Sequence, residues 1–174
     1  DSWASSPTQR KVYNTYGPTE CSNVCTYTEL RAGTAVNIGR VISGWAAFVA
    51  QAASQSSPRD FRSCPVGVPG ELLIGGPGVA AGYVKRPELT AAKFVRTPKH
   101  GRLYRTGDLA RWLADGNIEF LGRIDQQVKL RGFRIELGEI ENVLLGHAHV
   151  ELCAVTLWDR GPRSFLAAYV QLTP

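Results

Sequence analysis

The sequence predicts an α+β fold in which strands fill most of the chain and helices are few. Until about residue 122, short runs of strand-like composition are separated by glycine and proline, which end strands and start turns. After that point, apolar residues recur at the three- and four-residue intervals of a helix. This change of pattern divides the chain into a long strand-rich part and a shorter mixed part.

The segment at residues 122–141 contains the change. Apolar and basic residues alternate on both sides of Gly132, which predicts two strands joined by a tight turn. The basic side chains that then share one face are Lys129, Arg131 and Arg134. A helix is predicted next, with acidic residues in its first turns, where they suit the helix dipole, and with apolar positions at Leu137, Ile140, Val143 and Leu144. A glycine turn between basic strands also occurs in proteins that bind nothing there.

The beginning of the chain predicts a strand followed by a polar loop. Residues 11–16 have strand composition, and Gly17 and Pro18 end the run because they cannot continue a central ladder. Thr19 and Glu20 are therefore expected on a loop at the carboxyl end of a strand. A hydroxyl and a carboxylate at that place suit a phosphate oxygen and its Mg²⁺, although Gly-Pro-Thr is also an ordinary turn.

The middle and end of the chain predict further short elements. Residues 36–50 predict two strands around Gly39 and Gly44, and Asp108, after Thr-Gly, is expected on a loop. An acid there often only forms a turn, but it can also accept both hydroxyls of a ribose. The other expected elements are a loop at 51–64, a turn and strand within 65–83, a helix at 87–94, a hairpin at 110–121, and strands at 150–158 and 165–172.

Composition and charge limit the classes of function. The chain has 174 residues, 44% of them apolar, and no run approaches the roughly 18 apolar residues of a membrane span. Its four cysteines are scattered, which favours free cytosolic thiols over disulfides, and His147 and His149 lack partners at zinc-like spacing. Residues 85–134 hold twelve Lys or Arg against five Asp or Glu, a net charge of +7. The rest of the chain carries −2, which gives +5 for the whole chain. Without a nucleic-acid motif, this tract favours a phosphate-bearing small ligand or an acidic protein partner.

A glycine-rich run at residues 75–83 invites comparison with a dinucleotide fingerprint. Its spacing is Gly-x-Gly-x-x-x-Gly, and Pro77 removes one amide from any phosphate cradle. A dinucleotide site is therefore rejected.

Four motifs together resemble the adenylation domains of nonribosomal peptide synthetases, members of the adenylate-forming superfamily. They occur in the family's order and span nearly the whole chain: Asn-Thr-Tyr-Gly-Pro-Thr-Glu at 14–20, Gly-Glu-Leu-Leu-Ile and its glycine-rich continuation at 70–83, Tyr-Arg-Thr-Gly-Asp at 104–108, and the segment at 122–141. The second motif is mainly structural in the family. Ala81 stands where the family commonly has arginine, and the loop at 51–64 is longer than usual, with no inferred role.

The resemblance implies an α+β architecture in two parts. Residues 1–122 would be the β-rich closing part, a distorted barrel-like sheet, of the large adenylation domain. Residues 123–174 would be the hinge and the first part of the small α+β lid. The family's phosphate loop and the acidic anchor for an amino-acid substrate would precede residue 1, and its catalytic lysine would follow residue 174.

The resemblance also implies roles for single residues. In catalysis Thr19 would reach the α-phosphate and Glu20 would hold Mg²⁺. Tyr16 would stack on adenine and Asp108 would bind the ribose; the nucleotide contacts together would be Asn14, Tyr16, Gly17, Asp108 and Arg123. The acyl pocket would include Thr15, Asn23 and Val24. Asp125 would be the pivot of the lid, and the face used in thiolation would carry Lys129 and Gly132.

The implied enzyme would join an amino acid to AMP from Mg·ATP in the cytoplasm, with loss of pyrophosphate. It would then load the phosphopantetheine thiol of a carrier domain, working beside other synthetase domains. An acyl- or aryl-CoA ligase would differ only in the thiol acceptor, and the sequence Arg-Ile-Glu-Leu-Gly-Glu-Ile-Glu at 134–141 favours the synthetase. An alternative of another class is a non-catalytic module that binds an acidic carrier through the basic tract. No nucleic-acid or membrane partner is expected.

Overall fold

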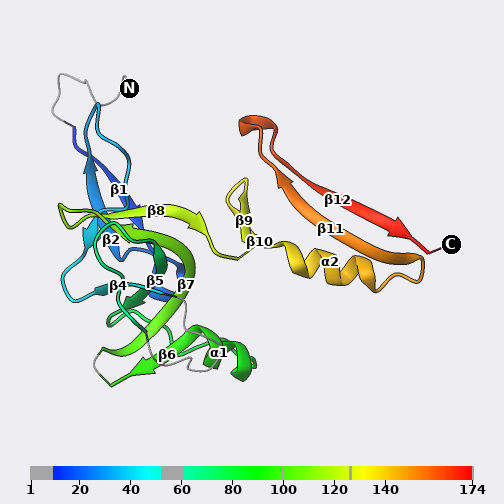
Figure 1. Cartoon of the computed structure of the whole chain (residues 1–174), viewed down its shortest axis with the longest axis horizontal. Coiled ribbons are helices and arrows are strands. Elements are labelled where there is room, and N and C mark those ends of the chain that lie inside the picture. The colour runs from blue at the N-terminus through cyan, green and yellow to red at the C-terminus, as the bar shows by residue number, and fades with distance from the viewer. Residues whose placement is uncertain (1–9, 52–60, 99, 126, 174) are drawn as a thin grey trace. The chain divides into compact units, whose positions relative to one another are not determined.

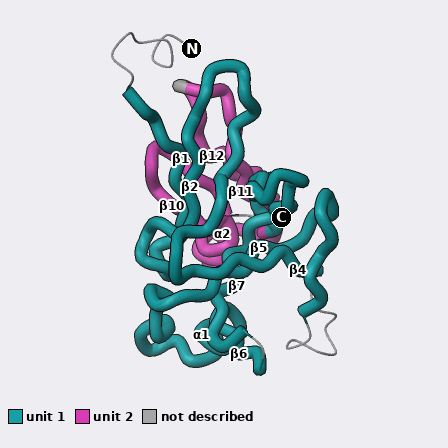
Figure 2. Tube along the Cα trace, turned by 90° about the vertical axis from the view of Figure 1, so that its left-hand side faces the viewer, with its two compact units in different colours: residues 1–124 teal, residues 125–174 magenta. Residues whose placement is uncertain are grey.

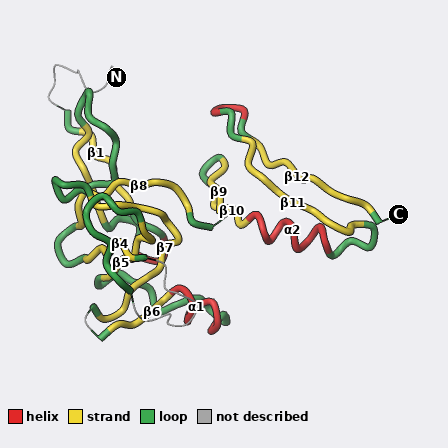
Figure 3. Tube along the Cα trace, viewed as in Figure 1, coloured by secondary structure: helices red, strands yellow, loops and turns green. Residues whose placement is uncertain are grey.

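The computed structural model describes residues 10–51, 61–98, 100–125 and 127–173. The chain forms two compact units, residues 1–124 and 125–174, which Figure 2 colours separately. Strands predominate in both units, as Figure 3 shows, and a few short helices accompany them. The expected α+β class is confirmed. Among the described helices, none is long and apolar enough to span a membrane.

The first unit is built around a five-stranded antiparallel sheet (Figure 1). Its central strand β7 pairs with β5 along one edge. Along its other edge, the first part of β7 pairs with β6 and the last part pairs with β8. On the far side of β5 lies β4. The strands are β4 (Ala46–Ala50), β5 (Gly70–Gly75), β6 (Phe94–Thr97), β7 (Gly101–Trp112) and β8 (Ile118–Arg123).

Strand β5 is buried on both faces, so its sequence is a continuous apolar run broken by one acid. Leu72 and Ile74 belong to the main core cluster, whereas Leu73 belongs to a second, smaller cluster together with Leu103. Glu71 is the charged exception and is only 5% exposed. A charge at such a position needs a partner, because desolvating an unpaired carboxylate is costly.

A three-stranded antiparallel sheet carries the first motif. It consists of β1 (Val12–Tyr16), β2 (Thr26–Leu30) and β3 (Arg40–Val41), and a 3₁₀ turn η1 (Thr19–Cys21) follows β1. The two sheets meet where Ile118 donates its N–H to the Gly39 carbonyl at 2.8 Å. Gly39 has φ +77°, and a Cβ there would lie 1.9 Å from the Tyr27 carbonyl oxygen. The junction therefore requires glycine.

The sequence predictions for this unit are partly confirmed. The two strands around Gly39 and Gly44 correspond to β3 and β4, and the helix expected after Arg86 is α1 (Pro87–Lys93). Strand β2 was not expected, and the placement of Asp108 on a loop was wrong, because Asp108 lies inside β7. Gly107 explains the error: it has φ +72° within the strand, so a turn-forming residue makes an irregular strand instead of ending it. The loop expected at 51–64 falls largely on residues 52–60, outside the described residues.

The second unit contains two hairpins and a helix. β9 (Gln127–Leu130) and β10 (Phe133–Glu136) form the first hairpin, with positive φ at Arg131 and Gly132, as its two-residue turn requires. The helix is α2 (Leu137–Leu145), and the second hairpin pairs β11 (Val150–Trp158) with β12 (Phe165–Leu172) through the turn η2 (Gly161–Arg163).

Helix α2 packs on β11 through part of the expected apolar face. Leu137 is buried, and the Glu141 carboxylate accepts the Val155 N–H at 2.8 Å, which ties the helix to the strand. The assignment of Val143 to the apolar face was wrong, because its side chain is 77% exposed. The basic pair Lys129 and Arg134 lies directly across the first hairpin, so these two side chains do share one face.

Candidate functional site

The turn after β1 is fixed by close backbone approach. Cys21 N–H donates to the Pro18 carbonyl at 2.9 Å, and Cys25 N–H donates to the Tyr16 carbonyl at 2.8 Å. A Cβ at Gly17 would lie 2.4 Å from the Asn23 carbonyl oxygen, so the chain can fold back only with glycine there. The folded-back turn holds the exposed Thr19 and the half-buried Glu20 at the end of the strand.

The ends of β1 and β8 meet the interior of β7 at Asp108. The Tyr16 hydroxyl donates to one Asp108 carboxylate oxygen, and Arg123 Nη1 donates to the other at 2.8 Å and to the Thr106 carbonyl at 3.0 Å. Asp108 is 6% exposed and lies directly across the ladder from Arg123. Burial, followed by the charge of Asp108, raises the pKa of Tyr16, which therefore stays a neutral donor. The structure thus brings together three of the expected nucleotide contacts.

A second layer of contacts holds Asp108 in place. Thr106 donates its hydroxyl to the Leu72 carbonyl at 2.7 Å and accepts the Asp108 N–H at 3.0 Å. Glu71 accepts the Gly107 N–H at 3.2 Å and two N–H groups of Arg105 at 3.0 and 2.7 Å. Sequence reasoning gave no role to Glu71, although an acid inside an apolar strand run was a signal available for it.

The Glu20 carboxylate is held by a residue from a distant motif. Tyr83 donates its hydroxyl to Glu20 Oε1 at 2.7 Å, and its oxygen lies 3.3 Å from the Tyr104 hydroxyl. The Ala80 N–H donates to the Glu20 carbonyl at 2.9 Å. Burial raises the pKa of Tyr83, which keeps this hydroxyl protonated. The glycine-rich run expected to be mainly structural therefore contacts the acid of the first motif.

Asn14, expected as a nucleotide contact, and the expected acyl-pocket residues flank the same turn. Asn14 donates its side-chain amide to the Asn37 carbonyl at 2.7 Å. Side chains alternate along a strand, so Thr15 points to the face of β1 opposite to Asn14 and Tyr16, and it is exposed. Asn23 has φ +71° and is exposed, and Val24 is 38% exposed.

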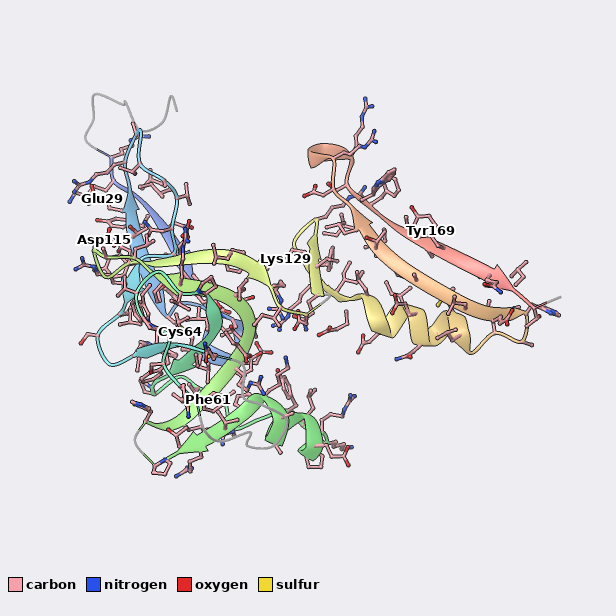
Figure 4. The ribbon with its side chains drawn as sticks, viewed as in Figure 1. Glu29, Phe61, Cys64, Asp115, Lys129 and Tyr169 are labelled. Carbon is pink, nitrogen blue, oxygen red and sulfur yellow. The ribbon has the colours of Figure 1, made fainter. Side chains whose placement is uncertain are left out.

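The expected hinge and thiolation residues belong to the second unit. Asp125 is the first residue of that unit, and its carboxylate accepts the Gln127 N–H at 3.2 Å. Lys129 is exposed on β9, where Figure 4 labels it, and Gly132 occupies the turn of the hairpin with φ +84°.

The chain matches known proteins along nearly its whole length. The family described as AMP-binding enzyme matches residues 2–84. Bacitracin synthase 2 of Bacillus licheniformis is 50% identical over 164 residues, which cover 91% of this chain and 6% of the relative. Tyrocidine synthase 1 of Brevibacillus parabrevis is 47% identical over 166 residues, which cover 91% of this chain and 15% of the relative.

Solved structures agree. PA1221, described as a nonribosomal peptide synthetase protein containing adenylation and PCP domains, matches with a TM-score of 0.76 and 29% identity. In sequence and in fold, the chain is similar to part of the adenylation domains of nonribosomal peptide synthetases. A four-domain synthetase bound to AMP and glycine, holo-AB3403, matches it with a TM-score of 0.59 and 39% identity. Each comparison covers 94% of the segment, which spans 33% and 12% of the two solved chains.

Proposed function

We propose that the intact enzyme containing this segment activates an amino acid with Mg·ATP and transfers it to the pantetheine thiol of a carrier domain. The observation that carries the proposal is the junction of Tyr16 and Arg123, at the ends of β1 and β8, with Asp108 inside β7. Support comes from the relatives, which are peptide synthetases, and from solved neighbours that contain PCP domains or are bound to AMP and glycine.

The ribose and adenine contacts follow from this junction. Each carboxylate oxygen of Asp108 accepts one hydrogen bond, from Tyr16 or from Arg123, and a carboxylate offers about four lone-pair sites. Asp108 can therefore accept ribose hydroxyls without losing its own partners. The Tyr16 ring, fixed through its hydroxyl, would stack on adenine, and Asn14 and Gly17 would complete the adenine contacts.

The phosphate and metal contacts fall on the turn η1. The exposed Thr19 hydroxyl would donate to an α-phosphate oxygen, and the Glu20 carboxylate would hold Mg²⁺. Among the described residues, no group of three or more His, Cys, Asp or Glu could form an all-protein metal cage. Mg²⁺ usually takes one or two carboxylates together with substrate phosphates and water, so this donor set fits it. When bound, the ion would neutralise charge on the α-phosphate.

The chemistry consists of two displacements without a covalent enzyme intermediate. A carboxylate oxygen of the amino acid attacks the α-phosphorus, the bond to the bridging oxygen of pyrophosphate breaks, and pyrophosphate leaves. The carrier thiol then loses its proton and attacks the acyl carbon, and AMP leaves. The residues of this chain position the substrates, with Thr15, Asn23 and Val24 assigned to the acyl pocket.

The second step requires the lid to change position, and the hinge is proposed at Asp125. The boundary between the two compact units falls between Ile124 and Asp125, which supports this choice. Residues 1–122 would then belong to the large domain and residues 123–174 to the hinge and lid. The hairpin with Lys129 and Gly132 would present its face during thiolation.

The proposed location is the cytoplasm, where ATP is available and the cysteines, all free in the structure, stay reduced. The test is an ATP–pyrophosphate exchange screen of the intact enzyme against amino acids, followed by loading of a carrier and of coenzyme A. We expect exchange with one or a few amino acids and loading of the carrier alone. Loading of coenzyme A would point to an acyl-CoA ligase. Carrier binding without nucleotide binding would point to a non-catalytic module.

A further inference from the structure

The run at residues 76–83 lies against the turn that carries Glu20, although the two are far apart in sequence. The Ala80 N–H donates to the Glu20 carbonyl at 2.9 Å, and Ser22 on the same turn donates its hydroxyl to the Gly78 carbonyl at 3.1 Å. A Cβ at Gly78 would lie 2.7 Å from the Trp45 ring and 2.9 Å from the Ser22 hydroxyl oxygen. The close approach of the two segments therefore depends on glycine.

Tyr83 is itself fixed on several sides. Its N–H donates to the Thr90 hydroxyl at 2.9 Å, and Thr90 belongs to α1. Its ring packs edge-to-face on the buried Phe94 at 5.4 Å between centroids, and Phe94 in turn packs on Tyr104 at 5.0 Å. The Tyr83 hydroxyl donates to Glu20 Oε1 at 2.7 Å, so it presents a donor at a fixed point to a flexible carboxylate.

We propose that Tyr83 is a positioning residue that orients the Glu20 carboxylate toward Mg²⁺, an inference that rests on the proposed function. Mg²⁺ demands near-ideal octahedral geometry, so a carboxylate on a three-residue turn binds it well only if its rotamer is fixed beforehand. Partners around the first ligands of a metal commonly supply this orientation. The glycine-rich motif thus sets the geometry of the metal ligand in addition to packing the sheet.

A purely structural role for Tyr83 predicts a different result. If the hydroxyl only satisfied a half-buried carboxylate, its removal would weaken every property of the site together. If it orients Glu20, its removal raises the metal requirement and leaves nucleotide binding without metal unchanged. Tyr104→Phe is a matched control, because it removes the neighbouring hydroxyl of the same cluster, which lies 3.3 Å from the Tyr83 oxygen.

The experiment compares Tyr83→Phe, Tyr104→Phe and wild type in the intact enzyme. The readouts are the Mg²⁺ concentration at half-maximal pyrophosphate exchange, and Mn²⁺ binding in the presence of α,β-methylene-ATP, followed by loss of the free Mn²⁺ signal in electron paramagnetic resonance. For Tyr83→Phe we expect both midpoints to rise about tenfold. This is the lower end of the range expected when a hydrogen bond to a charged group is lost. For Tyr104→Phe we expect midpoints close to wild type. AMP binding in EDTA should be unchanged in both variants.

A double-mutant cycle with Glu20→Gln isolates the pair. Adding Tyr83→Phe to Glu20→Gln should leave Mn²⁺ binding at the level of Glu20→Gln alone, because the carboxylate that Tyr83 orients is already absent. If the Mg²⁺ midpoint in Tyr83→Phe equals or falls below the wild-type value, the proposed role of Tyr83 is overturned. The proposed function stands in that case, provided that the wild-type enzyme catalyses exchange. An equal loss of AMP binding also overturns the proposed role of Tyr83, by making it a packing residue. A wild-type enzyme with no exchange overturns the proposed function itself.

Discussion

Replacing Asp108 tests the nucleotide site most directly. Asp108→Ala removes the carboxylate that would accept the ribose hydroxyls, and each hydrogen bond to a charged group contributes about 1.5–3 kcal/mol. Because about 1.4 kcal/mol corresponds to a factor of ten, loss of one such bond should raise the KM for ATP about 10- to 150-fold. The KM for the amino acid should change only a few-fold, since no acyl contact is assigned to Asp108.

The same substitution should also lower stability. Asp108 is 6% exposed and pairs with Arg123, whose side chain is 21% exposed. Removing one partner of a buried ion pair costs about 3–5 kcal/mol, and the partial exposure of Arg123 places the cost near the lower limit. Glu119→Gln is the matched control. Glu119 forms a neighbouring cross-strand ion pair with Arg111. This pair is more exposed than Asp108–Arg123, so it contributes only about 0–1 kcal/mol to stability.

The assay measures pyrophosphate exchange with one substrate varied and the other saturating, alongside chemical denaturation of each variant. The expected pattern is a selective rise of the ATP KM in Asp108→Ala and near-wild-type constants in Glu119→Gln. An equal rise of both KM values in Asp108→Ala would refute the ribose contact and leave Asp108 as a structural residue of β7.

Four further substitutions, one of them a control, test the hinge, the buried Glu71–Arg105 pair and the sheet junction. Asp125→Pro fixes φ near −65° and should keep pyrophosphate exchange within a few-fold while carrier loading falls about 10²-fold; parallel loss of both would indicate misfolding. Glu71→Gln should cost about 3 kcal/mol in denaturation of the intact domain, because the Arg105 charge loses its buried partner, and a change below about 1 kcal/mol would contradict this. Gly39→Ala should abolish folding, whereas Gly33→Ala, with the same φ of +77° but nothing within 4 Å, should cost about 1–2 kcal/mol; similar costs would refute the steric argument.

Much of the fold could be predicted from local sequence patterns. The last two strands were expected at residues 150–158 and 165–172, and β11 and β12 have those bounds. The turn at Gly132 was likewise expected. A glycine between two alternating runs indicates a hairpin turn from local sequence alone, without knowledge of long-range contacts. Such elements are specified by their own residues and by their nearest neighbours in the chain.

Other features depend on partners that sequence patterns do not reveal. Strand β2 reads Thr-Tyr-Thr-Glu-Leu, a largely polar run that becomes a strand through pairing with β1 and β3. The contact between Glu20 and Tyr83 joins residues 63 positions apart. Val143 fits the helical spacing but is 77% exposed, since the width of the apolar face depends on what packs against the helix.

If Asn23 lines the acyl pocket as proposed, its backbone restricts how that pocket could be redesigned. Ser22 and Asn23 both have positive φ, at +54° and +71°, and the folded-back turn leaves them little freedom. Asparagine, aspartate and glycine adopt this conformation at low cost, whereas β-branched residues do not. A substrate-switching library should therefore be restricted to these three residues at position 23, and full randomisation should be directed to Thr15, which lies in a regular strand.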